Sequence, residues 1–260
     1  MVEKWAKRLY LTLTFVFLYA PIAFLIIYSF NSEKNASKWG EFSLKWYSAL
    51  LNNDRILNAL YYTVLVAIIS ALASTVLGTI SALGISKMVG FKKKLILNVN
   101  YIPVLNPDIV TAISLMTLFI FLKMSFGLGT LVIAHIVFCT PYVILSVLPK
   151  LNQLPTDIVK AALDLGATPG YALRKVILPQ IMPGIFAGAL ISFTMSIDDF
   201  VISFFNTGGG VSNLSIEIYS MARRGLSPEI NALSTLMFIT IFILLFLANG
   251  RGLISKGDSK

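Results

Sequence analysis

The 260-residue sequence has few charged side chains, one cysteine and one histidine. Charged residues make up 13% of the chain, against about a quarter in soluble domains, while hydrophobic residues make up 57%. A chain of this composition and a mean hydropathy of +0.81 belongs in a membrane. The single Cys139 excludes an intrachain disulfide. The lone His135 makes a histidine-based zinc site improbable and is best interpreted as a packed, hydrogen-bonding group.

The sequence also has no nucleotide-binding motif. Its one glycine run, Gly208 to Gly210, is not followed by Lys-Ser or Lys-Thr, and no Walker A pattern occurs elsewhere. We therefore expect no cofactor in this chain, with ATP and magnesium bound by a partner subunit if the function uses ATP. The net charge of +9 would suggest nucleic acid for a soluble protein. In a membrane chain it indicates basic cytoplasmic loops, and we expect no nucleic-acid partner.

The apolar runs predict an all-α polytopic membrane protein with six transmembrane helices in a single domain, residues 1–260. A helix needs roughly 20 apolar residues to cross the hydrocarbon core. The first run is too long for a signal peptide and lacks a nearby cleavage site, so we interpret it as a retained helix. The six runs lie near Leu9–Phe30, Ala59–Ser86, Leu95–Leu122, Gly129–Pro149, Met182–Phe205 and Ile230–Asn249.

The distribution of Lys and Arg predicts the orientation of these spans. The two tails and the connections at 87–94 and 150–175 carry 14 basic residues, and the remaining connections carry seven. Basic loops stay on the cytoplasmic side, so we expect both termini and the segment from Lys150 to Gln180 in the cytoplasm. The chain would then be a multi-pass protein of the cytoplasmic (inner) membrane.

Small residues repeat every four positions in two of the spans, which predicts close helix packing. The repeats comprise Ser70, Ser74, Gly78, Ala82 and Ser86 in the second span, and Gly184, Gly188, Ser192 and Ser196 in the fifth. Such ridges imply a compact bundle or a partner subunit.

Three acidic residues fall within apparent spans: Asp108, Asp198 and Asp199. A carboxylate facing lipid costs about 2.5 to 3.5 kcal/mol, so these groups must face a cavity or a partner. If the helix continues through them, Ser192, Ser196 and Asp199 share one polar face with Ser203.

One hypothesis is a site for a cation in a translocation pathway, with Asp198, Asp199, Ser196, Ser192 and Asp108 as its polar groups and nearby Phe rings as apolar contacts. The alternative is that the acids cap a broken helix or bond to donors on other helices. Asp108, directly after Asn106 and Pro107, is the one most readily explained by a helix restart.

The cytoplasmic segment KAALDLGATPGYALRKVILP, residues 160–179, predicts a helix, a glycine elbow and a second helix. Thr156 can cap the first helix, Gly166 suits a left-handed turn, and Thr168 followed by Pro169 can start a second helix ending near Pro179. Ile158, Ala162 and Leu165 form a narrow apolar edge, which suits either a groove on another protein or the membrane surface.

These residues carry a resemblance to a known family. Ala161, Ala162, Gly166, Ala167 and the Ile-Leu-Pro at 177–179 are similar to the coupling loop of binding-protein-dependent ABC importer permeases. Lys160 departs from the pattern, which has Glu there. The resemblance implies a type I ABC importer permease fold and an ATPase-coupling role for Lys160, Ala161, Ala162, Asp164, Gly166 and Ala167.

Longer runs, including NPDIVTAISL at 106–115 and SFTMSIDDFVIS at 192–203, are similar to polyamine-importing members of that family. This resemblance implies a non-enzymatic permease subunit that passes spermidine or putrescine. It also implies a second permease, two copies of an ATPase, an external polyamine-binding protein and membrane lipid as partners.

Two other classes of function fit the residues less well. An intramembrane aspartyl protease needs its acids on separate helices in other motifs, and no rhomboid-type serine motif occurs because Lys87 follows Ser86. A channel or secondary transporter acting alone would leave the cytoplasmic elbow without a purpose, and the sequence shows no internal repeat.

Overall fold

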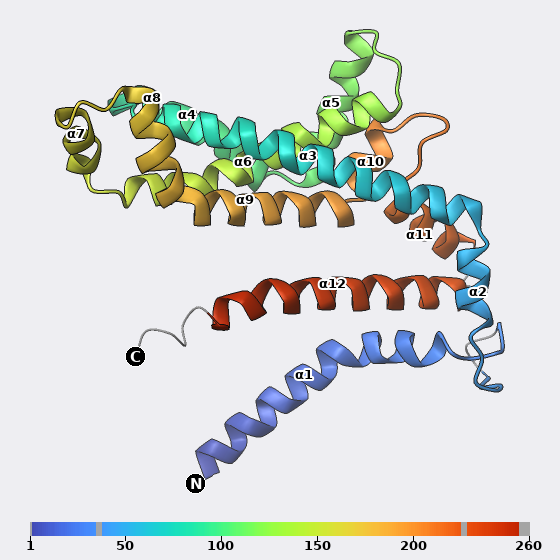
Figure 1. Cartoon of the computed structure of the whole chain (residues 1–260). Coiled ribbons are helices and arrows are strands. Elements are labelled where there is room, and N and C mark those ends of the chain that lie inside the picture. Colours follow the sequence, from blue (N-terminus) through green and yellow to red (C-terminus); the bar gives the residue numbers. More distant parts are fainter. Residues whose placement is uncertain (1, 35–37, 225–227, 255–260) are drawn as a thin grey trace. The chain divides into compact units, whose positions relative to one another are not determined.

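The computed structural model describes residues 2–34, 38–224 and 228–254, apart from the side chains of residues 2, 3, 156, 241 and 244–254. These residues form helices, with a single antiparallel bridge between Asn31 and Phe42 (Figure 1). The chain divides into two compact units, residues 1–57 with 218–260, and residues 58–217.

The first unit is built on α1 (Val2–Tyr28), α2 (Lys45–Leu51) and α12 (Pro228–Ile254). Within it α12 packs against both α1 and α2. The turn after α1 is fixed by buried polar contacts, since the indole nitrogen of Trp46 donates to the carbonyl of Asn31 at 2.7 Å. The hydroxyls of Ser29 and Tyr47 lie 2.6 Å apart. These bonds satisfy polar groups that apolar surroundings would otherwise leave unpaired.

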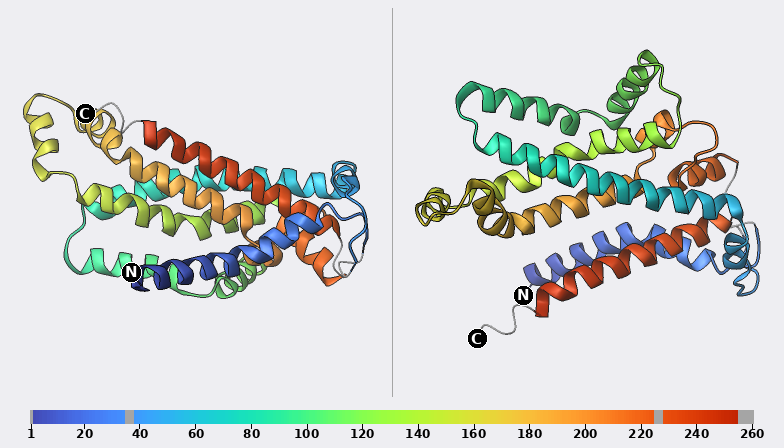
Figure 2. Two further views of the ribbon diagram at one scale, coloured as in Figure 1. Left: turned by 90° about the horizontal axis from the view of Figure 1, so that it is seen from below. Right: turned by 45° about the horizontal axis from the view of Figure 1, so that its top comes forward.

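The second unit is an assembly of long helices around α6, which packs against α9, α4, α5 and α10 (Figure 2). Buried apolar side chains fill it near both ends of α6, one group around Val147 and another around Phe138. Its helices are α4 (Gly90–Leu105), α5 (Asp108–Phe121), α6 (Leu128–Asn152), α7 (Thr156–Asp164), α8 (Pro169–Ala172), the π-helix η1 (Leu173–Ile177), α9 (Leu178–Asp198) and α10 (Val201–Asn206), together with most of α3 (Asp54–Ser86) and the start of α11 (Leu214–Arg223).

The predicted ridges of small residues lie at the centre of this second unit. A side chain at Gly78 would meet the Val143 side chain at 2.6 Å, and one at Gly188 would meet Val143 at 3.2 Å. Val143 on α6 is fully buried. The ridges of α3 and α9 therefore both pack on α6, which confirms the prediction that they permit close helix approach.

Among the described residues, four helical segments are long and apolar enough to cross a membrane: Lys4–Tyr28, Asp54–Ser86, Leu128–Asn152 and Pro169–Asp198. The bent pair α4 and α5 has the length and composition of a fifth, either as one broken span or as a re-entrant loop. The sixth predicted span, Ile230–Asn249, lies on α12, and most of its side chains after Thr240 are outside the described part of the chain. The prediction of an all-α chain with several apolar spans is confirmed, and the count of six stays a prediction.

Two predicted spans are not continuous helices. The run Leu95–Leu122 bends by 105° between α4 and α5. Pro107 disfavours a helical conformation at the preceding residue, and Asn106 is extended with ψ 147°. The run Met182–Phe205 ends as α9 at Asp198, because Asp199 adopts an extended conformation with ψ 126° before α10 begins.

Candidate functional site

The break between α9 and α10 is stabilised by the side chain of Asp199. Its carboxylate accepts hydrogen bonds from the amide of Ile202 at 3.1 Å, the amide of Ser203 at 2.8 Å and the Ser203 hydroxyl at 3.0 Å. The first amides of a helix have no partners within the helix, so this carboxylate caps α10. The predicted single helical face through Ser192, Ser196, Asp199 and Ser203 is wrong for this reason, since the chain leaves the helix at Asp199.

A buried polar network surrounds Asp199. His135 on α6 has Nδ1 2.8 Å from the Ser196 hydroxyl and Nε2 2.9 Å from the Ser203 hydroxyl. Its Nε2 also lies 3.7 Å from Asp199 Oδ2. Asn213, ahead of α11, donates to the Ser203 hydroxyl at 2.6 Å and to the Asp199 carbonyl at 3.2 Å. We call these five residues the Asp199 network; all are at most 9% exposed.

Ser192 lies one turn before this network and bonds to another helix. Its hydroxyl is 2.7 Å from that of Ser74 on α3, and both side chains are fully buried. Ser192 and Ser196 thus face neighbouring helices of the same unit.

Asp198 and Asp108 differ from Asp199 because their side chains are exposed. Neither forms an ion pair with Lys or Arg among the described residues. Asp108 begins α5 just after the bend, where the positive end of the helix dipole favours a carboxylate. It is also close enough to Asp199 for the two charges to interact. The two helix breaks therefore bring Asp108 and Asp199 near each other, although they are 91 positions apart in the sequence.

Sequence reasoning gave correct local roles to some of these residues and missed others. The interpretation of His135 as a packed, hydrogen-bonding group is confirmed by its two serine partners. Asn213 was not predicted. Its signal is an Asn directly before a helix, where its Oδ1 accepts from the amide of Ile216 at 3.0 Å. Among the described residues no group of three His, Cys, Asp or Glu side chains could hold a metal ion.

The segment at residues 160–179 has the predicted first helix and glycine elbow. Gly166 follows α7 with φ +86°, a conformation that glycine adopts without strain. Thr168 caps α8, its hydroxyl accepting from the amide of Tyr171 at 3.3 Å, and Pro169 starts the helix. Pro155 rather than Thr156 stands at the cap position of α7, where it forms no side-chain hydrogen bond.

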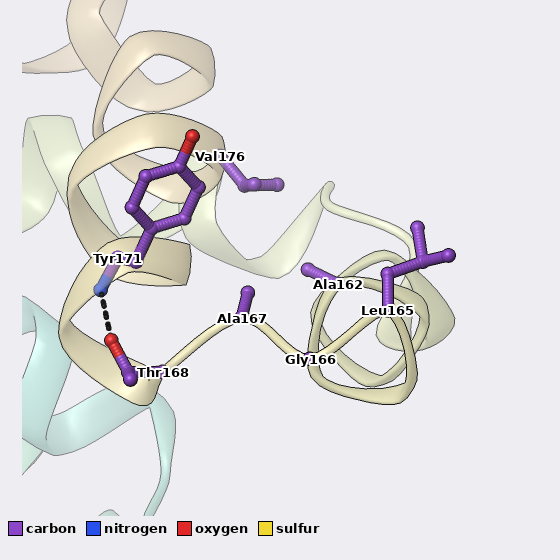
Figure 3. A pocket seen from close by; sticks show the side chains of 7 residues that line it. All are labelled: Ala162, Leu165, Gly166, Ala167, Thr168, Tyr171 and Val176. Atoms are coloured by element: carbon purple, nitrogen blue, oxygen red, sulfur yellow. Dashed lines mark hydrogen bonds between the residues drawn. The ribbon is translucent and has the colours of Figure 1, made fainter.

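Side chains on either side of the elbow enclose a shallow hollow between α7 and α8 (Figure 3). Leu165 is 89% exposed and Tyr171 is 59% exposed, so apolar surface faces outward here. The hollow is lined by Ala162, Leu165, Gly166, Ala167, Thr168, Tyr171 and Val176. Lys160 lies on the exposed side of α7, 3.3 Å from Asp157.

The second short helix of this segment does not end at Pro179 as predicted. It continues through η1 into α9, and in η1 the amide of Leu178 bonds to the carbonyl of Leu173, five residues earlier. Pro179 has no amide hydrogen to bond to the carbonyl of Lys175, which explains a locally widened turn. One helical rod therefore joins the elbow directly to Asp198.

Comparison with known proteins agrees with this architecture. Residues 74–250 match the family described as "Binding-protein-dependent transport system inner membrane component". The chain is 38% identical to the spermidine/putrescine permease PotC of Escherichia coli K12 over 94% of this chain and 92% of the relative. It is 39% identical to the putrescine permease PotI of the same organism, over 92% of this chain and 87% of that relative.

Two solved structures share the fold at low identity. An ABC transporter involved in the import of the polysaccharide alginate matches with a TM-score of 0.72 and 11% identity, over 99% of this chain and 97% of that one. The MetNI methionine ABC transporter matches with a TM-score of 0.60 and 19% identity, over 77% of this chain and 95% of that one. The chain belongs to the family of binding-protein-dependent inner membrane transport components: it is a permease subunit of an ABC importer, a transport component and not an enzyme.

Proposed function

We propose that this permease passes polyamines, spermidine or putrescine, across the cytoplasmic membrane. Two relatives at 38% and 39% identity are named as permeases for these substrates. The site chemistry supports the same class of substrate. Exposed carboxylates at Asp198 and Asp108, without Lys or Arg partners in the described chain, suit ammonium groups on an extended cation.

Asp198 is the group we propose for direct contact with the cation. Asp199 directs its carboxylate inward to the α10 cap, whereas Asp198 is exposed on the last turn of α9. The half-exposed ring of Phe204, whose centroid lies 5.2 Å from that of the tilted Phe200 ring, supplies an apolar surface for methylene groups beyond the break. Asp108 adds negative charge from the start of α5. Asp199, Ser196 and Ser192 support the site through their bonds within the unit.

The proposed orientation places this site in the outer part of the membrane. The Lys150 side chain lies against Gly184, so the basic end of α6 adjoins the early turns of α9. With basic residues and both termini in the cytoplasm, α9 runs outward for about 30 Å to Asp198, close to the thickness of the hydrocarbon core. A substrate released by an external binding protein would meet Asp198 early in its passage.

The elbow is the surface we propose for contact with the ATPase. Its exposed apolar side chains, Leu165 and Tyr171, border a turn that only glycine adopts without strain. The coupling residues of this proposal are Lys160, Ala161, Ala162, Asp164, Gly166 and Ala167. The ATPase holds the ATP and magnesium.

The proposed assembly has four kinds of subunit. This chain pairs with a second, PotB-like permease, two PotA-like ATPase copies and a PotD-like external binding protein. Membership of an ABC importer family supports the general composition. The relatives' names support the polyamine type.

Reconstitution tests the substrate class. The chain is assembled with the proposed second permease, ATPase and binding protein, and uptake of radiolabelled spermidine and putrescine into vesicles is measured with and without ATP on the ATPase side. We expect ATP-dependent uptake that excess unlabelled polyamine reduces and that excess methionine or an acidic saccharide does not. Absence of polyamine uptake in a complex that hydrolyses ATP with another solute would refute the proposal.

A further inference from the structure

His135 contacts both sides of the break that precedes α10. One ring nitrogen meets Ser196 in the last turn of α9, and the other meets Ser203 in the first turns of α10. The ring is fully buried, and these partners lie 61 and 68 residues away in the sequence. The His135 side chain on α6 therefore fixes the end of α9 relative to the start of α10.

An ionised Asp199 carboxylate sets the direction of the hydrogen bonds in the Asp199 network. Such a carboxylate only accepts, so the Ser203 hydroxyl gives it its single hydrogen at 3.0 Å. Ser203 can then only accept, from Asn213 at 2.6 Å and from His135 Nε2 at 2.9 Å. Nε2 of His135 therefore carries a hydrogen, and in the neutral imidazole Nδ1 accepts from Ser196.

Both nitrogens of His135 are used, and each has a different role. An apolar side chain of similar volume would leave Ser196 and Ser203 without these partners in a dry interior, where an unpaired polar group is costly. The break would relax, and Asp198, the residue next to Asp199, would move with it. The carbonyl of Asp198 also accepts from Ser215 at 3.4 Å, so its backbone lies at the edge of the same region.

We propose that His135 is a positioning residue for transport: it holds the break between α9 and α10 in the geometry that presents the Asp198 carboxylate to the passing cation. This inference rests on the proposed polyamine function. It assigns to His135 an effect on substrate affinity exerted through Asp198, in addition to its packing.

The test compares His135→Leu with His135→Gln in the reconstituted complex. The Gln side chain has an acceptor oxygen and a donor NH₂ group and can restore both serine contacts, whereas Leu restores neither. We expect His135→Leu to raise the KM for polyamine uptake by about tenfold to a hundredfold per assembled complex, because small misplacements of a binding group have effects of this size. The KM of His135→Gln should stay within about threefold of the parent value, well below that range.

Thr140→Val is the matched control. Thr140 lies on the same helix, and its hydroxyl donates to the Ile136 carbonyl one turn earlier and to no other group in the described part of the chain. It should leave KM unchanged. An equal loss in His135→Gln and His135→Leu would overturn the proposal, because restoring both contacts would then have no benefit.

A double-mutant cycle separates positioning from general destabilisation. If His135 acts through Asp198, His135→Leu combined with Asp198→Asn should raise KM no further than Asp198→Asn alone. Multiplied effects of the two substitutions would show that His135 acts elsewhere and would refute the proposal.

A chemical probe reports the geometry without transport. Asp198→Cys is reacted with a cationic methanethiosulfonate reagent; the native Cys139 is fully buried and serves as the unreactive background. Adding His135→Leu should change the reaction rate at least about fivefold, and adding His135→Gln should not. An unchanged rate with His135→Leu refutes positioning. A changed rate in a complex for which Asp198→Asn has no effect on uptake would instead refute the proposed cation contact.

Discussion

Neutralising Asp198 is the most direct test of the cation contact. Asp198→Asn keeps the size of the side chain and part of its hydrogen bonding but removes its charge. The side chain is exposed and caps nothing in the described chain, in contrast to that of Asp199. Assembly should therefore stay near the parent level while polyamine transport decreases.

The expected magnitude follows from the surroundings of Asp198. Two unit charges about 4 Å apart interact by about 1 kcal/mol in water and by about 4 kcal/mol at an effective dielectric constant of 20. Asp198 is exposed on one side and beside buried helix on the other, so we take an intermediate value of about 2 kcal/mol. Since about 1.4 kcal/mol corresponds to a factor of ten, kcat/KM should fall by about 30-fold.

The assay is uptake of labelled spermidine per assembled complex at several salt concentrations. The difference between parent and Asp198→Asn should shrink as salt rises, because salt screens an exposed charge. Parent-level kcat/KM in Asp198→Asn at low salt would refute the contact.

Asp199→Asn provides the contrast to this variant. In the parent the Asp199 carboxylate accepts three hydrogen bonds, and the Asn side chain would place an NH₂ group, itself a donor, among these donors. We therefore expect the free energy of unfolding to fall by about 1 to 3 kcal/mol and less complex to assemble. Full assembly of Asp199→Asn would contradict the stabilising role of its carboxylate.

Three further substitutions test packing and coupling. Gly78→Ala puts a methyl group 2.6 Å from the Val143 side chain and should lower the free energy of unfolding by about 1 to 3 kcal/mol. The control Gly84→Ala, on the same helix, meets nothing within 4 Å and should leave stability unchanged. Equal melting temperatures of the two variants would contradict the packing. Gly166→Pro cannot adopt φ +86° and should abolish substrate-stimulated ATP hydrolysis while membrane insertion persists; unchanged stimulated turnover would argue against the coupling role. Lys160→Ala removes only an exposed pair worth at most about 1 kcal/mol, so the ATPase should still co-purify, and its loss would show a direct contact.

The sequence predicted those features that depend on local periodicity. Gly78 and Gly188 belong to ridges in which small residues recur every four positions. Such a repeat places the small residues on one face of a helix, whichever helix packs against that face. Gly166 and Pro169 have strong backbone preferences, so the elbow was readable from the residue types alone. In each case the determining interactions lie within one or two helical turns.

The Asp199 network could not be predicted in the same way. His135 meets Ser196 and Ser203 only because α6 packs against α9 and α10, and no local pattern specifies which residues face each other across 61 positions of sequence. Apolar residues resume directly after Asp198 and Asp199, so the hydropathy of the run Met182–Phe205 indicates one continuous helix. The one local sign of a helix end here is an Asp that can cap the next helix. Asp198 and Asp199 are equally able to do so, and the sequence does not indicate which of them does.

Both ends of α9 are interrupted by hydrogen bonding rather than by a loss of apolar character. At its start Pro179 lacks the amide that an α-helix requires at that point, and the chain forms η1. At its end Asp199 supplies an acceptor that outcompetes continuation of the helix. Between these points the chain stays helical although Pro183 donates no hydrogen bond, and so the residues at its two ends, Pro179 and Asp199, also set the spacing between the elbow and Asp198. Insertion or deletion of one residue in α9 would rotate Asp198 by about 100° relative to the elbow, which no change in side-chain charge could offset.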